Sequence, residues 1–316
     1  METKLLYLFT RTPLHVGAGS SVGAIDQPIQ RERHTQFPII PGSSLKGSLT
    51  DQWPASQIDD NGKASRLTTE KQGDKSIVKM ADPAAWLFGS DTTELSFAGS
   101  LLFSEATLLA FPIRSAKGSY AWVTCPHILA KAHREGVLVN KLGTPLPAED
   151  QAIYQSGAPL DLDGTIVLED YALTLCINSN LASLAEEMSK LVDDEIYESI
   201  KERLVIVSDH MMTHFVSTAC EVATHVRIDD RTGTAEGTGL FNQENVPSET
   251  LFYAPIRATK SRVPNGEYAD KTDADALAEF GKKVAAQRVF QFGADASIGL
   301  GYCSATLQDM QPSPTA

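Results

Sequence analysis

The chain has 316 residues, 42% of them hydrophobic and 21% charged, and its formal net charge at pH 7 is −13. This composition excludes a wholly disordered protein, and the length fits one large domain, which we place over residues 1–316. The four cysteines form no CxxC pair, which argues against a zinc knuckle and a disulfide framework. The sequence contains no apolar run of roughly 20 residues and no signal-peptide pattern, so we expect a cytoplasmic protein.

Charge is distributed unevenly along the chain. Residues 1–50 contain five basic and three acidic side chains, whereas residues 141–200 contain two basic and twelve acidic ones. The overall acidity argues against a free nucleic-acid-binding protein, because phosphate contacts need Lys and Arg. Two interpretations stay open: both segments are solvated faces, or one part of the surface binds a polyanion that the other part repels.

Residues 5–10 predict a buried strand, because apolar side chains occupy both of its faces. A Gly/Ser stretch follows, and Pro41-Gly42 then predicts a turn before a helix for which Ser43 or Ser44 is the expected N-cap. The next predictions, in chain order, are a polar surface insertion over 54–75, a short helix over 76–89, strands within 99–112, 119–125 and 164–177, and a helix over 181–203. They are followed by a long hairpin or strand pair within 204–256 around a turn at 229–233, a helix from Thr272 to about Arg288, and a strand pair that frames residues 291–305.

The irregular alternation of strands and helices predicts an α+β domain with an antiparallel or mixed sheet, helices mostly on one face, and insertions. Thr272 and Asp275 have the spacing of a capping box at the start of the last helix. No GxGxxG with a downstream acid stands at a strand–helix junction, and no phosphate-binding GxxxxGKS or GxxxxGKT pattern occurs. Dinucleotide-binding and P-loop sites are therefore excluded.

Two segments could bind an anion. Gly293, Gly299 and Gly301 belong to a glycine-rich loop, where the backbone can come close to a phosphate; the alternative is a tight connection between two strands. Ser44 and Lys46 lie at the start of a predicted helix, where free N–H groups and the helix dipole favour an anion; the alternative is ordinary capping. A lysine in the first turn opposes the dipole, which favours an anionic partner.

Residues 12–49, TPLHVGAGSSVGAIDQPIQRERHTQFPIIPGSSLKGSL, resemble the signature of the RAMP superfamily of CRISPR-associated proteins. Within that superfamily the chain resembles the fourth, backbone subunits of type III-B Cmr complexes. The resemblance continues, in order, over most of the chain. The further matching segments are residues 86–89, 111–126, 224–241, 248–255 and the C-terminal glycine loop.

The resemblance implies a ferredoxin-like, RRM-type core with insertions and a thumb-like β-hairpin, for which residues 204–256 supply candidate strands. It also implies polymerisation of the chain into a helical filament along guide RNA, together with other Cmr subunits, and cleavage of bound target RNA once per subunit. A filament fits the charge pattern, because each subunit needs only one weak basic groove and many grooves act together on one RNA.

Asp26 lies in the polar loop where the resemblance places the aspartate used for target RNA cleavage. A carboxylate there can bind a divalent metal ion, Mg²⁺ or Mn²⁺, largely through water, or accept a proton. The alternative is a loop aspartate that caps a turn. His15 precedes the glycine stretch and could transfer a proton or contact RNA, although a histidine at a strand end is often structural.

Lys46, Arg114 and Lys117 are the expected phosphate contacts, with Ser44 and the glycine loop as further donors. Arg31 and Arg33 could hold the target strand beside Asp26. For any one arginine the alternative is a surface salt bridge that contributes little. These cationic and hydroxyl side chains would form an RNA-binding surface.

Five other residues have ordinary structural explanations. His210 and His214 have a spacing that suits a metal on a helix, but the Val/Thr-rich segment predicts a strand, so we expect no metal site there or at His225. Trp86 and Trp122 lie in apolar runs and are expected in the core.

The sequence therefore predicts a metal-dependent endoribonuclease that acts on target RNA in an assembled type III-B complex, with a 2′,3′-cyclic phosphate as product. Three alternatives stay open: a guide-RNA-binding subunit without catalysis, a guide-processing endonuclease that depends on His15 and no metal, and a metabolic enzyme with a glycine-rich ligand loop.

Overall fold

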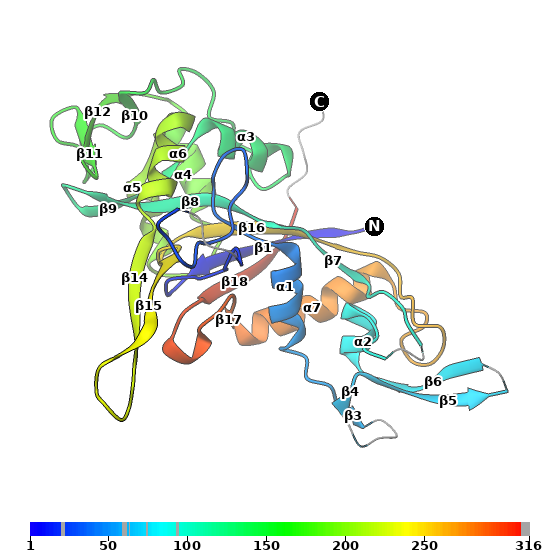
Figure 1. Ribbon diagram of the computed structural model, residues 1–316. Coiled ribbons are helices and arrows are strands. Elements are labelled where there is room, and N and C mark those ends of the chain that lie inside the picture. Colours follow the sequence, from blue (N-terminus) through cyan, green and yellow to red (C-terminus); the bar gives the residue numbers. More distant parts are fainter. Residues whose placement is uncertain (20–22, 59–61, 63, 74, 93–94, 311–316) are drawn as a thin grey trace.

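The computed structural model describes residues 1–19, 23–58, 62, 64–73, 75–92 and 95–310 (Figure 1). In this part of the chain the main sheet has the order β11-β12-β10-β13-β9-β8-β16-β1-β18-β17, with β2 beside β8 and β7 beside β16. Its strands are β1 (Thr3–Thr10), β2 (Ile39–Ile40), β7 (Leu101–Phe103), β8 (Ala106–Ser115), β9 (Ser119–Thr124), β10 (Gln151–Ile153), β11 (Thr165–Leu168), β12 (Tyr171–Cys176), β13 (Leu204–Val207), β16 (Leu251–Ala258), β17 (Val289–Gln291) and β18 (Tyr302–Asp309).

Helices and separate hairpins complete the described fold. The helices are α1 (Gly42–Thr50), α2 (Pro83–Phe88), α3 (Pro126–Arg134), α4 (Leu181–Met188), α5 (Ile200–Arg203), α6 (Asp209–Thr218) and α7 (Asp273–Gln287), with short 3₁₀ turns η1 (Tyr197–Ser199) and η2 (Ala296–Ile298). The hairpins are β3 (Gln57–Ile58) with β4 (Ala64–Ser65), β5 (Leu67–Gln72) with β6 (Lys75–Ala81), and β14 (Glu221–Ile228) with β15 (Ala235–Asn245).

The centre of the sheet consists of β8, β16, β1 and β18, and every neighbouring pair among them is antiparallel. In the chain, α1 lies between β1 and β8, and α7 lies between β16 and β18. Parallel pairs occur farther out, between β9 and β13 and between β10 and β12. The predicted combination of helices with a mixed sheet is therefore confirmed.

Both faces of the central strands are covered. Leu6 on β1 pairs with Leu307 on β18, so both side chains point to one face, and Leu307 lies against α7 near Gly281. Phe9 points to the opposite face, where its ring centroid lies 5.1 Å from that of Tyr197 in η1. Figure 1 accordingly shows α1 and α7 on one side of β1 and α3 to α6 on the other. The prediction that helices lie mostly on one face is wrong, because α3, α4, α5 and α6 cover the second face.

Two predicted helices begin at other residues than expected. Helix α1 begins at Gly42 with Pro41 as its N-cap, so neither Ser43 nor Ser44 caps it. Within 76–89, strand β6 runs to Ala81 before the short helix α2 begins. The capping box of Thr272 and Asp275 is confirmed at the start of α7.

Residues 54–75 contain the β3–β4 hairpin, β5 and the first residue of β6, and most of their described side chains are exposed or half-buried. The strand expected within 164–177 is two paired strands, β11 and β12. The helix expected over 181–203 is divided into α4, η1 and α5. Trp86 and Trp122 are both buried in the core, as predicted.

Segment 204–256 contains a helix that the sequence analysis missed. The hydroxyl of Ser208 accepts a hydrogen bond from the N–H of Met211 and caps α6, whose buried face includes Phe215. His210 and His214 therefore lie on a helix and not on a strand. Across the described residues, no cluster of three or more His, Cys, Asp or Glu side chains could hold a metal ion.

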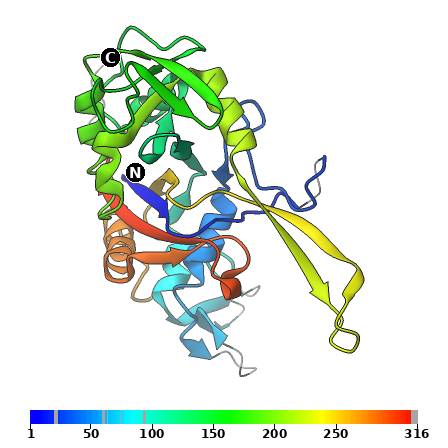
Figure 2. The same ribbon diagram turned by 90° about the vertical axis from the view of Figure 1, so that its left-hand side faces the viewer.

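The predicted hairpin in the same segment is present as β14 and β15, which turn at residues 229–233. Figure 2 shows that this hairpin projects away from the body of the molecule. Several apolar side chains along it are exposed: Val222, Val226, Ile228 and Leu240. The hairpin thus forms an arm, and its base joins the main body at the end of β15.

Candidate nucleic-acid interface

The base of the β14–β15 arm is the point where distant parts of the chain meet. Leu14 pairs with Val246 directly after β15, and Gln27 pairs with Gln243 within it. The N–H of Gln27 donates to Asn242 O at 3.0 Å, and the N–H of Glu244 donates to Gln27 O at 2.9 Å. The loop that follows β1 is therefore held along the end of β15 by main-chain hydrogen bonds.

Asp26 lies on this loop with an exposed side chain. Its Oδ2 accepts a hydrogen bond of 2.9 Å from the backbone N–H of Asn242. Among the described residues Oδ1 has no hydrogen-bond or ion-pair partner. The carboxylate is thus fixed by one oxygen at the base of the arm, and the other oxygen is available to a ligand.

His15 lies beside the same strand end but is 5% exposed. Its Nδ1 lies 2.6 Å from the carbonyl oxygen of Glu244, so Nδ1 carries the proton and donates. In the neutral ring Nε2 is then the unprotonated nitrogen. Asn242 and Glu244, the contacts of Asp26 and His15, are two residues apart on one strand, about 7 Å.

Glu244 connects the loop to the arm through both carboxylate oxygens, and its side chain is 5% exposed. Oε1 lies 2.6 Å from NH2 of Arg31, and Oε2 accepts the N–H of Ile29 at 3.1 Å. Arg31 also donates to the carbonyl oxygen of Gln36 at 2.8 Å and contacts Cys220 Sγ at 3.3 Å. Burial raises the pKa of the Cys220 thiol to about 12, so this contact is to a neutral thiol. Arg31 therefore fixes the loop, and its guanidinium is already occupied.

The C-terminal glycine loop packs against the segment that carries His15. The N–H of Ala294 donates to His15 O at 2.9 Å, and the N–H of Gly301 donates to Pro13 O at 2.8 Å. A Cβ on Gly293 would overlap the carbonyl oxygen of His15, and one on Gly301 would overlap that of Phe292. At these two glycines the backbone therefore comes close to other backbone atoms of the same chain.

Gly299 differs from those two glycines. It has a φ of +89°, and a Cβ added there would meet no atom within 4 Å. The loop is tied to the arm by Gln243, whose Nε2 donates to Asp295 Oδ2 at 2.6 Å. The exposed face of the loop around Gly299 is therefore open next to the base of the arm.

The remaining predicted RNA contacts are dispersed. Lys46 on α1 and Arg33 on the loop are exposed, and in the described part of the chain neither side chain has an ion-pair or hydrogen-bond partner. Ser44 is half-buried in the first turn of α1. These residues can be reached from solvent without breaking another interaction.

Arg114 and Lys117 lie elsewhere, at the turn between β8 and β9. Arg114 forms an ion pair with Glu169, and Lys117 Nζ donates to the carbonyl oxygen of Asp161 at 2.6 Å. Both partners belong to the acid-rich segment 141–200. The structure therefore brings His15, Asp26 and the glycine loop together, but it does not place these two cations beside them.

Sequence reasoning missed the residues of β15 that organise this site. Asn242, Gln243, Glu244 and Asn245 form a run of polar residues at the end of a strand, and the last three are buried. The run of four consecutive polar residues directly before Val246-Pro247 could have indicated this site. A strand end without an apolar face must form hydrogen bonds with its buried polar groups, so such a run is expected to have partners elsewhere in the fold.

The model of the RAMP superfamily matches residues 8–304. The chain belongs to this superfamily. It is 32% identical over 316 residues to a CRISPR system Cmr endoribonuclease Cmr4 from Pyrococcus furiosus, an alignment that covers 98% of this chain and 97% of that protein. It is 24% identical to a CRISPR system CMR subunit Cmr4 from Saccharolobus solfataricus, over 82% of this chain and 85% of that one.

Several solved structures have the same fold as this chain. Oligomeric Cmr4 from Pyrococcus furiosus is 28% identical, with a TM-score of 0.67 over 98% of this chain and 100% of that chain. A chain of a type III-B Cmr-beta complex bound to cognate target RNA is 19% identical, with a TM-score of 0.65 over 97% of each chain, and shows likeness of fold alone. No helix in the described part of this RAMP protein is long and apolar enough to cross a bilayer.

Proposed function

We propose that this RAMP protein is the backbone subunit of a type III-B CRISPR effector complex. Copies of the chain assemble along guide RNA with other Cmr subunits, and each copy cleaves bound target RNA once. The full-length similarity to a Cmr endoribonuclease supports this role. The observation that carries the catalytic part is Asp26, an exposed carboxylate held at the base of a projecting arm by the N–H of Asn242.

The fold supports the proposal. Strands β1, β8, β16 and β18 with helices α1 and α7 follow the chain order β-α-β-β-α-β, and their spatial order is β18-β1-β16-β8. This order supports the proposal of a ferredoxin-like core. Residues 1–316 would then be one RAMP domain, with the β14–β15 hairpin as its thumb.

The chemistry follows from one fixed carboxylate. In the proposed reaction the 2′-hydroxyl of the target RNA loses its proton and attacks the adjacent phosphorus, the bond to the 5′-oxygen breaks, and the departing 5′-oxygen takes up a proton from water. The products carry a 2′,3′-cyclic phosphate and a 5′-hydroxyl. Asp26, held through Oδ2, has Oδ1 free to accept the proton of the hydroxyl or to bind a divalent cation. Recovery of 3′-hydroxyl ends from cleaved RNA would reject this route.

A divalent cation fits this site as a partly hydrated ion. Mg²⁺ usually keeps several waters and is held by one or two carboxylates together with substrate phosphates, and Asp26 Oδ1 can supply the protein ligand for Mg²⁺ or Mn²⁺. Such an ion would supply charge neutralisation at the scissile phosphate. The protein's own part is to keep the carboxylate at the base of the arm, where RNA can reach it.

His15 fits a positioning role better than proton transfer. It is buried, and its Nδ1–H is used by the carbonyl of Glu244. We therefore assign it to hold the glycine loop and β15 together. Lys46, Ser44, Arg33 and the loop around Gly299 remain the proposed RNA contacts. Arg114 and Lys117 could join them only by leaving Glu169 and Asp161.

The test is Asp26→Asn in the complex assembled with partner subunits and guide RNA. We expect loss of target cleavage with unchanged assembly and unchanged guide RNA content. Asp270→Asn, which changes another exposed aspartate, is the matched control and should cleave normally. Full cleavage by the Asp26→Asn complex would favour a purely structural subunit. Cleavage that resists a chelator but is lost in His15→Ala would favour a guide-processing type of enzyme.

A further inference from the structure

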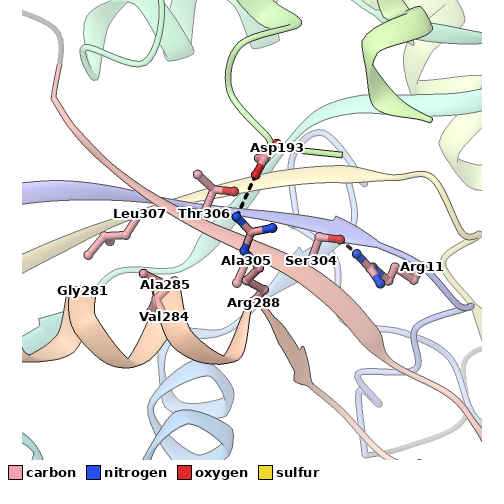
Figure 3. Close-up of a pocket in the computed structure, with 10 residues that line it drawn as sticks. All are labelled: Arg11, Asp193, Gly281, Val284, Ala285, Arg288, Ser304, Ala305, Thr306 and Leu307. Atoms are coloured by element: carbon pink, nitrogen blue, oxygen red, sulfur yellow. Dashed lines mark hydrogen bonds and ion pairs between the residues drawn. The ribbon is translucent and has the colours of Figure 1, made fainter. Parts of the chain in front are cut away.

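A small pocket of about 210 Å³ lies between α7, β18 and the acid-rich segment, outside the site described above. Figure 3 shows Arg11 and Arg288 at this pocket, with Asp193 facing Arg288. The residues that line it are Arg11, Asp193, Gly281, Val284, Ala285, Arg288, Ser304, Ala305, Thr306 and Leu307. Two arginines line the pocket, and each has a carboxylate partner: Asp194 beside Arg11 and Asp193 beside Arg288.

Arg11 is held in place by buried partners. Its Nε donates to Ser304 Oγ at 2.6 Å, and its NH2 lies 3.5 Å from Asp194 Oδ2. Ser304 is buried and its hydroxyl donates to Asp194 at 3.0 Å. The side chain of Asp194 is only 11% exposed. These interactions fix the side chain of Arg11, which is still 49% exposed to solvent.

Arg288 is held far more loosely. Its NH2 lies 3.1 Å from Asp193 Oδ2, and the two side chains are 72% and 78% exposed. Ion pairs of this kind contribute little to stability. Arg288 also ends α7 with a φ of +58°, a conformation in which a helix normally has glycine. An arginine with this backbone strain and a weak partner suggests a role beyond closing the helix.

The chain around Asp193 is anchored on both sides. Gln308 Nε2 donates to the carbonyl oxygens of Lys190 and Leu191, at 2.9 and 3.2 Å, and Asp194 is held by Ser304. Among the described residues, the ion pair with Arg288 is the one polar interaction of the Asp193 side chain. Its carboxylate can therefore rotate away from Arg288 without moving the segment.

The pocket adjoins the glycine loop that we propose as an RNA contact. The N–H of Arg11 donates to Tyr302 O at 2.7 Å, and the N–H of Gly301 donates to Pro13 O two residues farther along. Ser304 lies three residues after Gly301 on β18. A polyanion lying along the loop would reach Arg11 and Arg288 next.

We propose that this pocket binds a phosphodiester group of the guide RNA between Arg11 and Arg288, and that Asp193 is an exchangeable counterion that leaves Arg288 when the phosphate arrives. The inference rests on the proposed function, which supplies the RNA. Arginine suits this exchange because its planar guanidinium pairs with carboxylate and phosphate oxygens in the same geometry.

The test uses the full-length chain and a fluorescently labelled single-stranded guide-like RNA, with binding measured over a series of salt concentrations. Arg288→Gly removes the guanidinium and suits the positive φ, so the variant should fold. We expect binding about threefold weaker per subunit, the effect of one partly exposed ion pair. The slope of log Kd against log salt should fall by about 0.7. Lys260→Ala, a distant exposed lysine, should leave both quantities unchanged.

Asp193→Asn separates counterion exchange from a change in net charge. We expect tighter RNA binding when Arg288 is present and no tightening in the Arg288→Gly background. Equal tightening in both backgrounds would overturn the exchange. Binding by Arg288→Gly equal to that of the unmodified chain would overturn the pocket assignment while leaving the proposed function intact. An effect seen only when target RNA is added would overturn the assignment to the guide strand. Absence of guide RNA binding by the unmodified chain, both alone and assembled with its partner subunits, would overturn both proposals.

Discussion

The carboxylate of Glu244 and the guanidinium of Arg31 lie 2.6 Å apart, and their side chains are 5% and 14% exposed. These two residues are 213 positions apart in the chain. Their ion pair joins the loop that carries Asp26 to the strand that forms the arm. Because both side chains are largely shielded from water, removal of one leaves the other as a buried charge without a partner.

Glu244→Ala is therefore expected to lower the free energy of unfolding by about 3–5 kcal/mol. Chemical denaturation measures this loss. The Arg31→Met, Glu244→Met double variant should be less destabilised than either single variant, because no buried charge remains unpaired. Glu186→Ala breaks exposed ion pairs with Lys190 and Lys201 and is the matched control, and its denaturation midpoint should stay close to that of the unmodified chain.

Gly301→Ala should be more harmful than Gly299→Ala, although both residues have a positive φ. A Cβ at Gly301 overlaps the carbonyl oxygen of Phe292, whereas a Cβ at Gly299 meets nothing within 4 Å. We expect losses of about 3 and about 1 kcal/mol in the free energy of unfolding. Equal losses would show that backbone strain alone, and not the close approach, requires glycine at 301.

Glu249 is expected to make stability depend on pH. Burial, with a smaller contribution from Asp194, raises the pKa of its carboxyl from 4.5 to about 7. The folded chain then holds a proton that the unfolded chain releases, so stability falls as the pH rises from about 4.5 through about 7.

Glu249→Gln removes this titration. The variant should unfold at a higher denaturant concentration than the unmodified chain at pH 8, and the difference should shrink toward zero near pH 4.5. Denaturant midpoints for both proteins at several pH values provide the measurement. A constant difference between the two proteins across this range would contradict the assignment of the pH dependence to Glu249.

Shortening the arm should separate stability from cleavage. Val226 and Leu240 face each other on β14 and β15, so Asn-Gly can replace residues 227–239 as a two-residue hairpin turn. Thermal unfolding should change little, since the removed segment lies beyond the body of the molecule (Figure 2). Guide RNA binding should persist while target cleavage by the assembled complex falls. Full cleavage without the tip would contradict a role for the arm in presenting RNA to Asp26.

The sequence predicted the local features of this fold and missed those made by distant contacts. The buried first strand, the capping box of Thr272 and the turn at 229–233 follow from short patterns, and all three are present. Helix α6 was missed because Val and Thr favour strands, although the Ser208 cap and a buried helical face decide its structure.

In the candidate site, too, local features could be predicted from the sequence and contacts between distant residues could not. Asp26 could be singled out from its resemblance to a family signature, but its partner Asn242 lies 216 residues away. The engagement of Arg31 with Glu244, and of Arg114 with Glu169, depends on the tertiary fold, so both arginines looked equally free in the sequence.

The contact that fixes Asp26 comes from a main-chain N–H and not from a side chain. Every amino acid except proline can offer that group, so the residue at position 242 can be exchanged without releasing the carboxylate. The side chains at this end of the arm can therefore vary while the carboxylate of Asp26 stays in register with the backbone. A search for correlated substitutions between positions 26 and 242 would find none, even though the two residues touch.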